Sequence, residues 1–299
     1  MWIYLGLVSA VLLGLYDVCK KHALNHNAVL PVLFLSTVAG FLPMPFFLAA
    51  SRLAPEFMQQ IHCYVPVATL SEHLHILLKA GIVSTSWVLA YFAVKHLPIS
   101  LFSPIRASDP MWTLIGAVLL FHERPLPMQW VGMAVIFCCY YAFSLIGRKE
   151  GVVFHHSKWI LYIFLATLIG SISSLYDKYL IQQLGYTPML VQFWFAFYNV
   201  ALLGSFTAIF WWPHRAIFTR FQWRWSIPAI GLLLVAADFV YFNAVKNPDA
   251  LIVILSLLRR SSVVVSFAVG VALFGDVNRR RKAWALAGIL AGVILIVLA

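Results

Sequence analysis

Ten long apolar runs constrain this chain more than any other feature, because they take up most of its 299 residues. An α-helix needs about 20 apolar residues to cross a hydrocarbon core that is about 30 Å thick. The runs cover residues 2–21, 28–50, 74–95, 99–121, 127–147, 158–182, 188–212, 225–245, 250–273 and 282–299. The chain is therefore predicted to be an all-α integral membrane protein with ten transmembrane helices.

Composition excludes the other broad classes of protein. Hydrophobic residues make up 63% of the chain and charged residues 10%, whereas soluble domains average about 45–50% and about 25%. A soluble enzyme, a nucleic-acid-binding module and a disordered chain are thus excluded. The net charge of +11 comes mostly from basic residues between the apolar runs, where such residues set the topology in the membrane.

Short patterns recur between the two halves of the chain. The recurring segments are 15–17 at 175–177, 91–95 at 241–246, Arg106 at Arg259, and 120–123 at 273–276. The first half carries an additional irregular segment at 51–73. The apolar run within this segment is too short to span a bilayer. We therefore divide the chain into two five-helix repeats, residues 1–150 and 151–299.

The odd number of helices in each repeat has a consequence for topology. The second repeat must enter the membrane in the opposite sense to the first. Inverted repeats are typical of secondary transporters, whose substrate site lies between the repeats near the bilayer midplane. We expect a central cavity of this kind.

Each repeat ends with a short acidic turn before its last helix, Phe121-His122-Glu123-Arg124 and Phe274-Gly275-Asp276-Val277. With the duplication and the ten helices, these turns resemble the EamA-like domains of the drug/metabolite transporter superfamily. The resemblance covers essentially the whole chain. The second turn departs from the usual Gly-Glu-Arg through Asp276 and Val277.

A narrower likeness involves two predicted helices. Arg106 precedes Asp109-Pro110, and Arg259-Arg260 form a basic pair, which is similar to the triose-phosphate and nucleotide-sugar translocator branch. This resemblance implies that the basic pair binds a substrate phosphate and that Arg106 is the matching basic residue of the predicted helix 99–121.

The same three arginines are functional candidates on physical grounds. An arginine at the centre of a membrane helix costs about 2.5–3.5 kcal/mol, and its usual explanation is function. A guanidinium suits bidentate binding of phosphate or carboxylate. The alternative is structural pairing: Arg106 with Asp109 at i,i+3, and Asp238 with Arg259 or Arg260.

The predicted helices contain further candidates for gating, proton coupling and the wall of the cavity. Two Tyr-Asp pairs, each followed by a lysine, fit either a gate with a proton-coupling carboxylate or an interfacial tyrosine with a local Asp–Lys pair. Asp109 and Asp238 join the coupling candidates, and three aromatic residues fit the cavity wall or simple packing. The residues are Tyr16, Asp17, Lys20, Tyr176, Asp177 and Lys178 in the pairs, and Trp87, Tyr91 and Tyr241 in the wall.

Orientation is left open by two conflicting indications. Connections after odd-numbered helices carry thirteen Lys and Arg, and those after even-numbered helices carry five, namely Arg52, Lys79, Arg124, Lys178 and Lys246. The positive-inside rule then puts both termini outside, whereas the family resemblance implies cytoplasmic termini.

Taken together, these features predict a secondary transporter of a small organic anion, phosphorylated metabolites included, that works by alternating access. Three alternatives stay open: an exporter of amino acids or other zwitterions, a polyprenyl-phosphate lipid translocator, and a membrane-embedded lipid-modifying enzyme. The last would need a nucleophile or a metal-ligand set inside the bundle. The sequence shows neither a His-Glu-x-x-His nor a Cys-x-x-Cys pattern, so we expect no enzyme, metal or cofactor.

The expected partners are a small-molecule substrate and the lipid bilayer, and no nucleic acid. The expected location is the bacterial inner membrane, with several passes. A monomer and a homodimer both remain compatible with the repeat symmetry.

Overall fold

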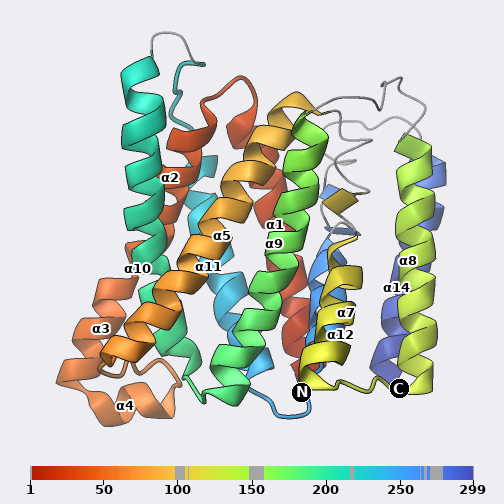
Figure 1. The fold of residues 1–299 in the computed structure, drawn as a ribbon, viewed down its shortest axis with the longest axis horizontal. Coiled ribbons are helices and arrows are strands. Elements are labelled where there is room, and N and C mark those ends of the chain that lie inside the picture. The colour runs from red at the N-terminus through yellow and green to blue at the C-terminus, as the bar shows by residue number, and fades with distance from the viewer. Residues whose placement is uncertain are drawn as a thin grey trace.

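The computed structural model describes residues 2–97, 105–106, 108–147, 158–215, 219–262, 264–265, 268–269 and 279–298. Helices make up the regular structure of these residues, and no strand occurs in them. The first half contains α1 (Trp2–Leu24), α2 (Val29–Phe41), α3 (Met44–Leu53), α4 (Pro55–Gln60), α5 (Leu70–His96), α7 (Asp109–Phe121) and α8 (Pro127–Gly147) (Figure 1).

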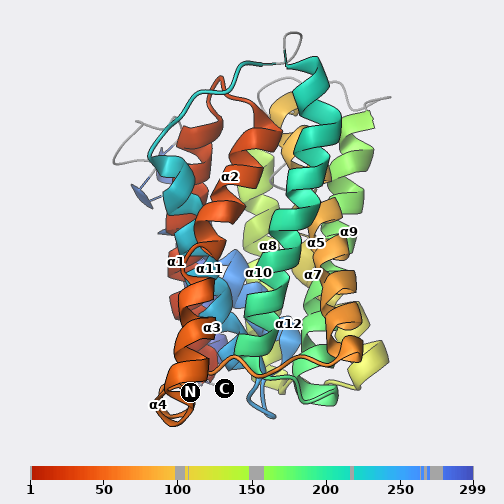
Figure 2. The ribbon, with the colours of Figure 1, turned by 90° about the vertical axis from the view of Figure 1, so that its left-hand side faces the viewer.

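The second half begins with α9 (Lys158–Lys178), which continues into the π-helical turn η2 (Tyr179–Gln183). Then follow α10 (Pro188–Phe206), η3 (Thr207–Trp211), η4 (Trp212–His214), α11 (Ser226–Val245), α12 (Ile252–Arg260) and α14 (Arg279–Leu298). Figure 2 shows the long helices standing side by side, with α3 and α4 at the end of the bundle where both labelled termini lie. We call this end the terminal end.

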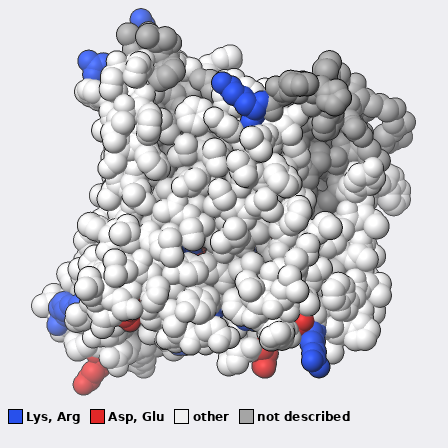
Figure 3. Space-filling view, viewed as in Figure 1, with Lys and Arg blue, Asp and Glu red and all other residues white. Residues whose placement is uncertain are grey.

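The structure confirms an all-α, multi-pass membrane fold. In the described part of the chain, 6 helical segments are long and apolar enough to cross a bilayer, and shorter apolar helices lie at Asp109–Phe121, Pro127–Cys139 and Ala287–Ile296. Figure 3 shows a broad uncharged surface, with Lys, Arg, Asp and Glu gathered toward its two ends. That distribution is what a hydrocarbon layer around the bundle requires. The total of ten spans stays a prediction.

Two of the predicted helices are interrupted where their charged residues lie. Within run 99–121, α7 begins only at Asp109, after a turn at Ser108. Pro110 has no N–H and favours the first turn of a helix, so it explains a start at this point. Within run 250–273, α12 ends at Arg260 and a turn follows. Arg259 and Arg260 therefore lie at the end of α12, whereas the run 250–273 predicted them inside a single helix.

The core forms around α12. Val253, Ile254, Leu255, Leu257 and Leu258 are all fully buried. A helix that is apolar around its whole circumference must be enclosed by other elements. Accordingly, α12 packs against α1, α7 and α11. Its last two residues are the arginines, so the core itself carries the basic pair into the middle of the bundle.

One close helix crossing gives a first testable prediction. Gly231 of α11 lies so near α2 that an added Cβ would overlap the Ser36 carbonyl and crowd the Gly40 amide. Gly231→Ala must force the two backbones apart. We expect it to lower the free energy of unfolding by about 1–3 kcal/mol or more. In α5, an added Cβ at Gly81 meets nothing within 4 Å.

Gly81→Ala is therefore the matched control. It should be neutral or stabilising by up to about 1 kcal/mol, because alanine favours a helix over glycine. Thermal unfolding of the two detergent-purified variants measures the difference. Equal melting temperatures would contradict the close crossing of α2 and α11.

Candidate functional site

A cavity of about 280 Å³ lies inside the bundle, lined by residues from α1, α5, α7, α9, α10, α11 and α12 and by Arg106. Almost all the candidate residues named from the sequence reach it. The lining includes Tyr16, Asp17, Lys20, Trp87, Tyr91, Arg106, Asp109, Asp177, Asp238, Tyr241, Arg259 and Arg260. Tyr176 does not line the cavity; its ring stacks on Tyr179 with centroids 5.8 Å apart. Neighbouring residues of a helix point about 100° apart, which explains why Tyr176 diverges from Asp177.

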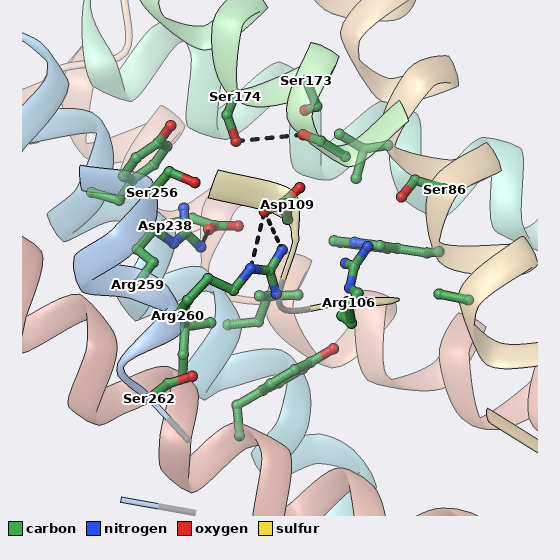
Figure 4. Close-up of a pocket in the computed structure, with 18 of the residues that line it drawn as sticks. Ser86, Arg106, Asp109, Ser173, Ser174, Asp238, Ser256, Arg259, Arg260 and Ser262 are labelled. Carbon is green, nitrogen blue, oxygen red and sulfur yellow. Dashed lines mark hydrogen bonds and ion pairs between the residues drawn. The ribbon is translucent and has the colours of Figure 1, made fainter. Parts of the chain in front are cut away.

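Arg260 holds the carboxylate at the start of α7. Its Nη2 and Nε lie 2.5 and 2.9 Å from Asp109 Oδ2, as the dashed lines in Figure 4 show. Asp109 Oδ1 also accepts a hydrogen bond from Ser171 at 2.8 Å. The local pair of Asp109 with Arg106 is not found. The turn at Ser108 breaks the helix between them, so the i,i+3 geometry does not apply.

Arg259 pairs with Asp238, which is one of the structural pairings that the sequence suggested. Its Nη2 lies 2.7 Å from Asp238 Oδ1 in α11. Its guanidinium also lies 4.1 Å from the centroid of the Tyr241 ring, at cation–π distance. Because α12 directs its last two side chains to different sides, each arginine reaches a different helix.

Arg106 makes no ion pair with any residue that the structure describes. Its Nη1 donates to the Ala166 carbonyl at 3.3 Å, which occupies one of five guanidinium donors. Figure 4 shows it standing apart from Arg260 and Asp109. Gly170 lies next to this guanidinium, since a Cβ at this position would be in van der Waals contact with Arg106 Nη1, at 3.4 Å.

Lys79 is the important residue that the sequence argument missed. Its assignment to a connection is wrong: it lies in α5, is 2% exposed and pairs with Asp177. Its Nζ also lies 4.4 Å and 4.9 Å from the centroids of Phe195 and Phe242. The signal was present, because Lys79 lies inside the apolar run 74–95 and so met the criterion applied to the arginines.

The expected local pair of Asp177 with Lys178 is also absent. Lys178 turns away from the cavity to Glu123, at 2.6 Å. In η2, Gln182 donates to the Val245 and Asn247 carbonyls, each at 2.8 Å. The Gln182 contacts join η2 to the end of α11, and the Lys79–Asp177 pair joins α5 to α9.

At the end of α1, the local pair is the arrangement found. Lys20 Nζ lies 3.1 Å from Asp17 Oδ1 and 4.7 Å from the centroid of the Tyr16 ring. The hydroxyls of Tyr16 and Tyr91 lie 3.3 Å apart. Two buried tyrosines from different helices thus meet beside this pair.

Among the described residues that line the cavity, one cation has no counter-charge of its own. Four ion pairs join the lining residues: Lys20–Asp17, Lys79–Asp177, Arg259–Asp238 and Arg260–Asp109. Arg106 is the fifth basic residue of the described lining. The ionised site therefore has one positive charge more than its acids can balance. In the described residues, no group of three His, Cys, Asp or Glu is placed to hold a metal ion.

Known proteins resemble the chain in sequence and in fold. Residues 1–145 match the EamA-like transporter family. A probable 4-amino-4-deoxy-L-arabinose-phosphoundecaprenol flippase subunit ArnE of Salmonella typhi is 27% identical over 75 residues, which are 24% of this chain and 68% of that protein. The protein of the same description from Escherichia coli O157:H7 is 25% identical over 80 residues, 26% of this chain and 72% of that protein.

The fold comparison extends over nearly the whole chain. A crystal structure aligns with a TM-score of 0.73 and 15% sequence identity, covering 99% of this chain and 96% of that one. This likeness shows the fold alone. The likeness to the triose-phosphate and nucleotide-sugar branch stays a prediction. The chain is a multi-pass integral membrane protein, and its residues 1–145 are similar to the EamA-like transporter family.

Proposed function

We propose that the protein is a secondary transporter of a small organic anion, phosphorylated metabolites included. The observation that carries this proposal is Arg106, a cavity-lining guanidinium without an ion pair among the described residues. A charge inside a membrane protein is costly unless something compensates it. A bound anionic group would do so, and its phosphate or carboxylate oxygens match the donors that Arg106 has free.

The size of the cavity limits the substrate. At about 280 Å³, it lies just below the range of about 300–1,000 Å³ for small-molecule sites. It therefore suits a small metabolite. Trp87 and Tyr91 supply apolar surface to the cavity wall, which also includes Arg106 and Arg260.

Alternating access is the mechanism we propose. Two five-helix repeats, residues 1–150 and 151–299, would enter the membrane in opposite senses and rock about the cavity between them. The ion pairs fit this role, because Arg260–Asp109 and Lys79–Asp177 each join residues of the two halves. We place the protein in the bacterial inner membrane by analogy with its bacterial relatives.

A ligand screen by thermal shift tests the proposal. Purified protein is heated with inorganic phosphate, phosphorylated sugars, nucleotides, carboxylates or amino acids. An anion at about 100 times its Kd should stabilise the wild type by about 2.7 kcal/mol and Arg106→Gln far less. Arg52→Gln is the matched control, since Arg52 is exposed on α3, outside the cavity. Stabilisation by amino acids in wild type and Arg106→Gln alike, with no effect of anions, would replace the proposal by a zwitterion exporter.

Translocation of a polyprenyl-phosphate lipid is the second candidate, favoured by two observations. The matched relatives are described as phosphoundecaprenol flippase subunits. A second, apolar cavity of about 520 Å³ also lies among α2, α5, α9 and α10, where Leu89, Phe92 and Phe206 contribute to its wall. It would accommodate hydrocarbon. Stabilisation by undecaprenyl phosphate, with no effect of the soluble anions, would favour this candidate.

A further inference from the structure

The acidic turn between α7 and α8 lies outside the cavity, yet it determines where α12 begins. Leu251, the N-cap residue of α12, offers no side-chain hydrogen bond. Instead, Glu123 accepts from the backbone amides of Ile252 at 2.7 Å and Val253 at 3.5 Å. A carboxylate at this position satisfies unpaired amides and interacts favourably with the helix dipole. Glu123 thus caps a helix 129 residues further along the chain.

The backbone bends sharply to present this carboxylate. His122 has a positive φ of 53°, a conformation that few residues other than glycine adopt. The Glu123 amide then donates to the Ala117 carbonyl at 3.3 Å. The turn is therefore fixed to the end of α7.

Lys178 completes the surroundings of Glu123. Its Nζ lies 2.6 Å from Glu123 Oε1 and 3.5 Å from the Ala250 carbonyl. Glu123 is only 6% exposed, so a buried carboxylate without these donors would cost several kcal/mol. Three donors from α9 and α12 make its burial possible.

The α7–α12 pair is consequently held at both ends. Near the start of α7, Asp109 binds Arg260 at the end of α12. Just beyond the end of α7, Glu123 binds the start of α12. Since α12 has 9 residues, a shift of its start carries Arg259 and Arg260 with it.

We propose that Glu123 is a positioning residue for the basic pair of the cavity. It acts through α12 and does not touch the substrate. Without it, the first turn of α12 loses its cap, and the two arginines lose their fixed position relative to Arg106.

A cysteine at Ser256 reports the position of α12 without any ligand. Ser256 is buried, lines the cavity and lies midway along α12. In a background with the four native cysteines replaced by alanine, the rate of its reaction with a small methanethiosulfonate reagent is measured. Glu123→Ala should raise this rate about fivefold, the equivalent of the roughly 1 kcal/mol that an N-cap contributes.

Two further variants separate positioning from stability. The double variant Glu123→Ala with Lys178→Met removes both buried charges, so it should melt higher than Glu123→Ala alone while keeping the raised Ser256→Cys rate. Ile136→Ala creates a buried gap between α8 and α14 and should lower the melting temperature without changing that rate. A rate that followed the melting temperature in all variants would overturn the proposal.

The affinity for an anion found in the screen gives the second readout, and this arm rests on the proposed function. Its Kd should rise about fivefold in Glu123→Ala and in the double variant, which again corresponds to the roughly 1 kcal/mol contributed by an N-cap. The Kd should stay unchanged in Ile136→Ala. A raised cysteine rate with no anion binding even in the wild type would sink the anion proposal alone. An unchanged cysteine rate would sink the positioning role alone.

Discussion

Replacing Arg106 with glutamine should weaken anion binding by about 10- to 150-fold and leave the protein at least as stable as the wild type. The expected loss corresponds to the roughly 1.5–3 kcal/mol that hydrogen bonds to charged groups contribute. No loss of stability is expected because Arg106 has no ion pair in the described residues and gives only one long hydrogen bond, to Ala166. Removing a cation that has no ion pair among the described residues relieves its desolvation cost.

The contrast with Arg260→Gln makes this test specific. Arg260 is the ion-pair partner of Asp109, whose side chain is 4% exposed. Without that partner, a buried carboxylate remains, and a loss of about 3–5 kcal/mol is typical. Isothermal titration with the anion from the screen and thermal unfolding are measured on both variants. If Arg106→Gln unfolds as early as Arg260→Gln while still binding the anion, Arg106 is a structural residue.

The sequence was sufficient for the broad fold and for most of the cavity lining. The hydrophobic runs predict helices because every backbone group in lipid must be satisfied internally. The charged residues inside the runs predict the cavity because charge in lipid is tolerated mainly where helices enclose it. Both arguments need only the order of residues along the chain, and Arg259 with Asp238 shows that they can suggest a pairing across helices.

Pairings that depend on the exact position of a helix end were not predictable. Asp109 binds Arg260 because α7 starts at Asp109 and α12 stops at Arg260. A hydropathy window does not resolve such ends, since apolar residues continue beyond them. Lys79 was misassigned for a related reason. A basic residue near the edge of an apolar run was counted as a loop residue, whereas Lys79 lies in α5 and pairs with Asp177.

The Lys79–Asp177 pair leads to a second large effect, a loss of stability. Asp177→Asn leaves the Lys79 ammonium, 2% exposed, without a counter-charge. Breaking a buried pair by removing one partner costs about 3–5 kcal/mol. The nearby rings of Phe195 and Phe242 offset a part of this, since cation–π contacts contribute about 2 kcal/mol when desolvated. We therefore expect Asp177→Asn to unfold at a clearly lower temperature than the wild type.

A double-mutant cycle decides whether the loss comes from the pair itself. Lys79→Met alone strands the Asp177 carboxylate and should destabilise comparably, whereas Lys79→Met with Asp177→Asn removes both charges. An apolar side chain between Phe195 and Phe242 suits that site, so the double variant should regain most of the lost stability. Thermal unfolding of the three variants gives the coupling energy between residues 79 and 177. Simple additivity of the two single losses would mean that Lys79 and Asp177 do not interact in the folded protein.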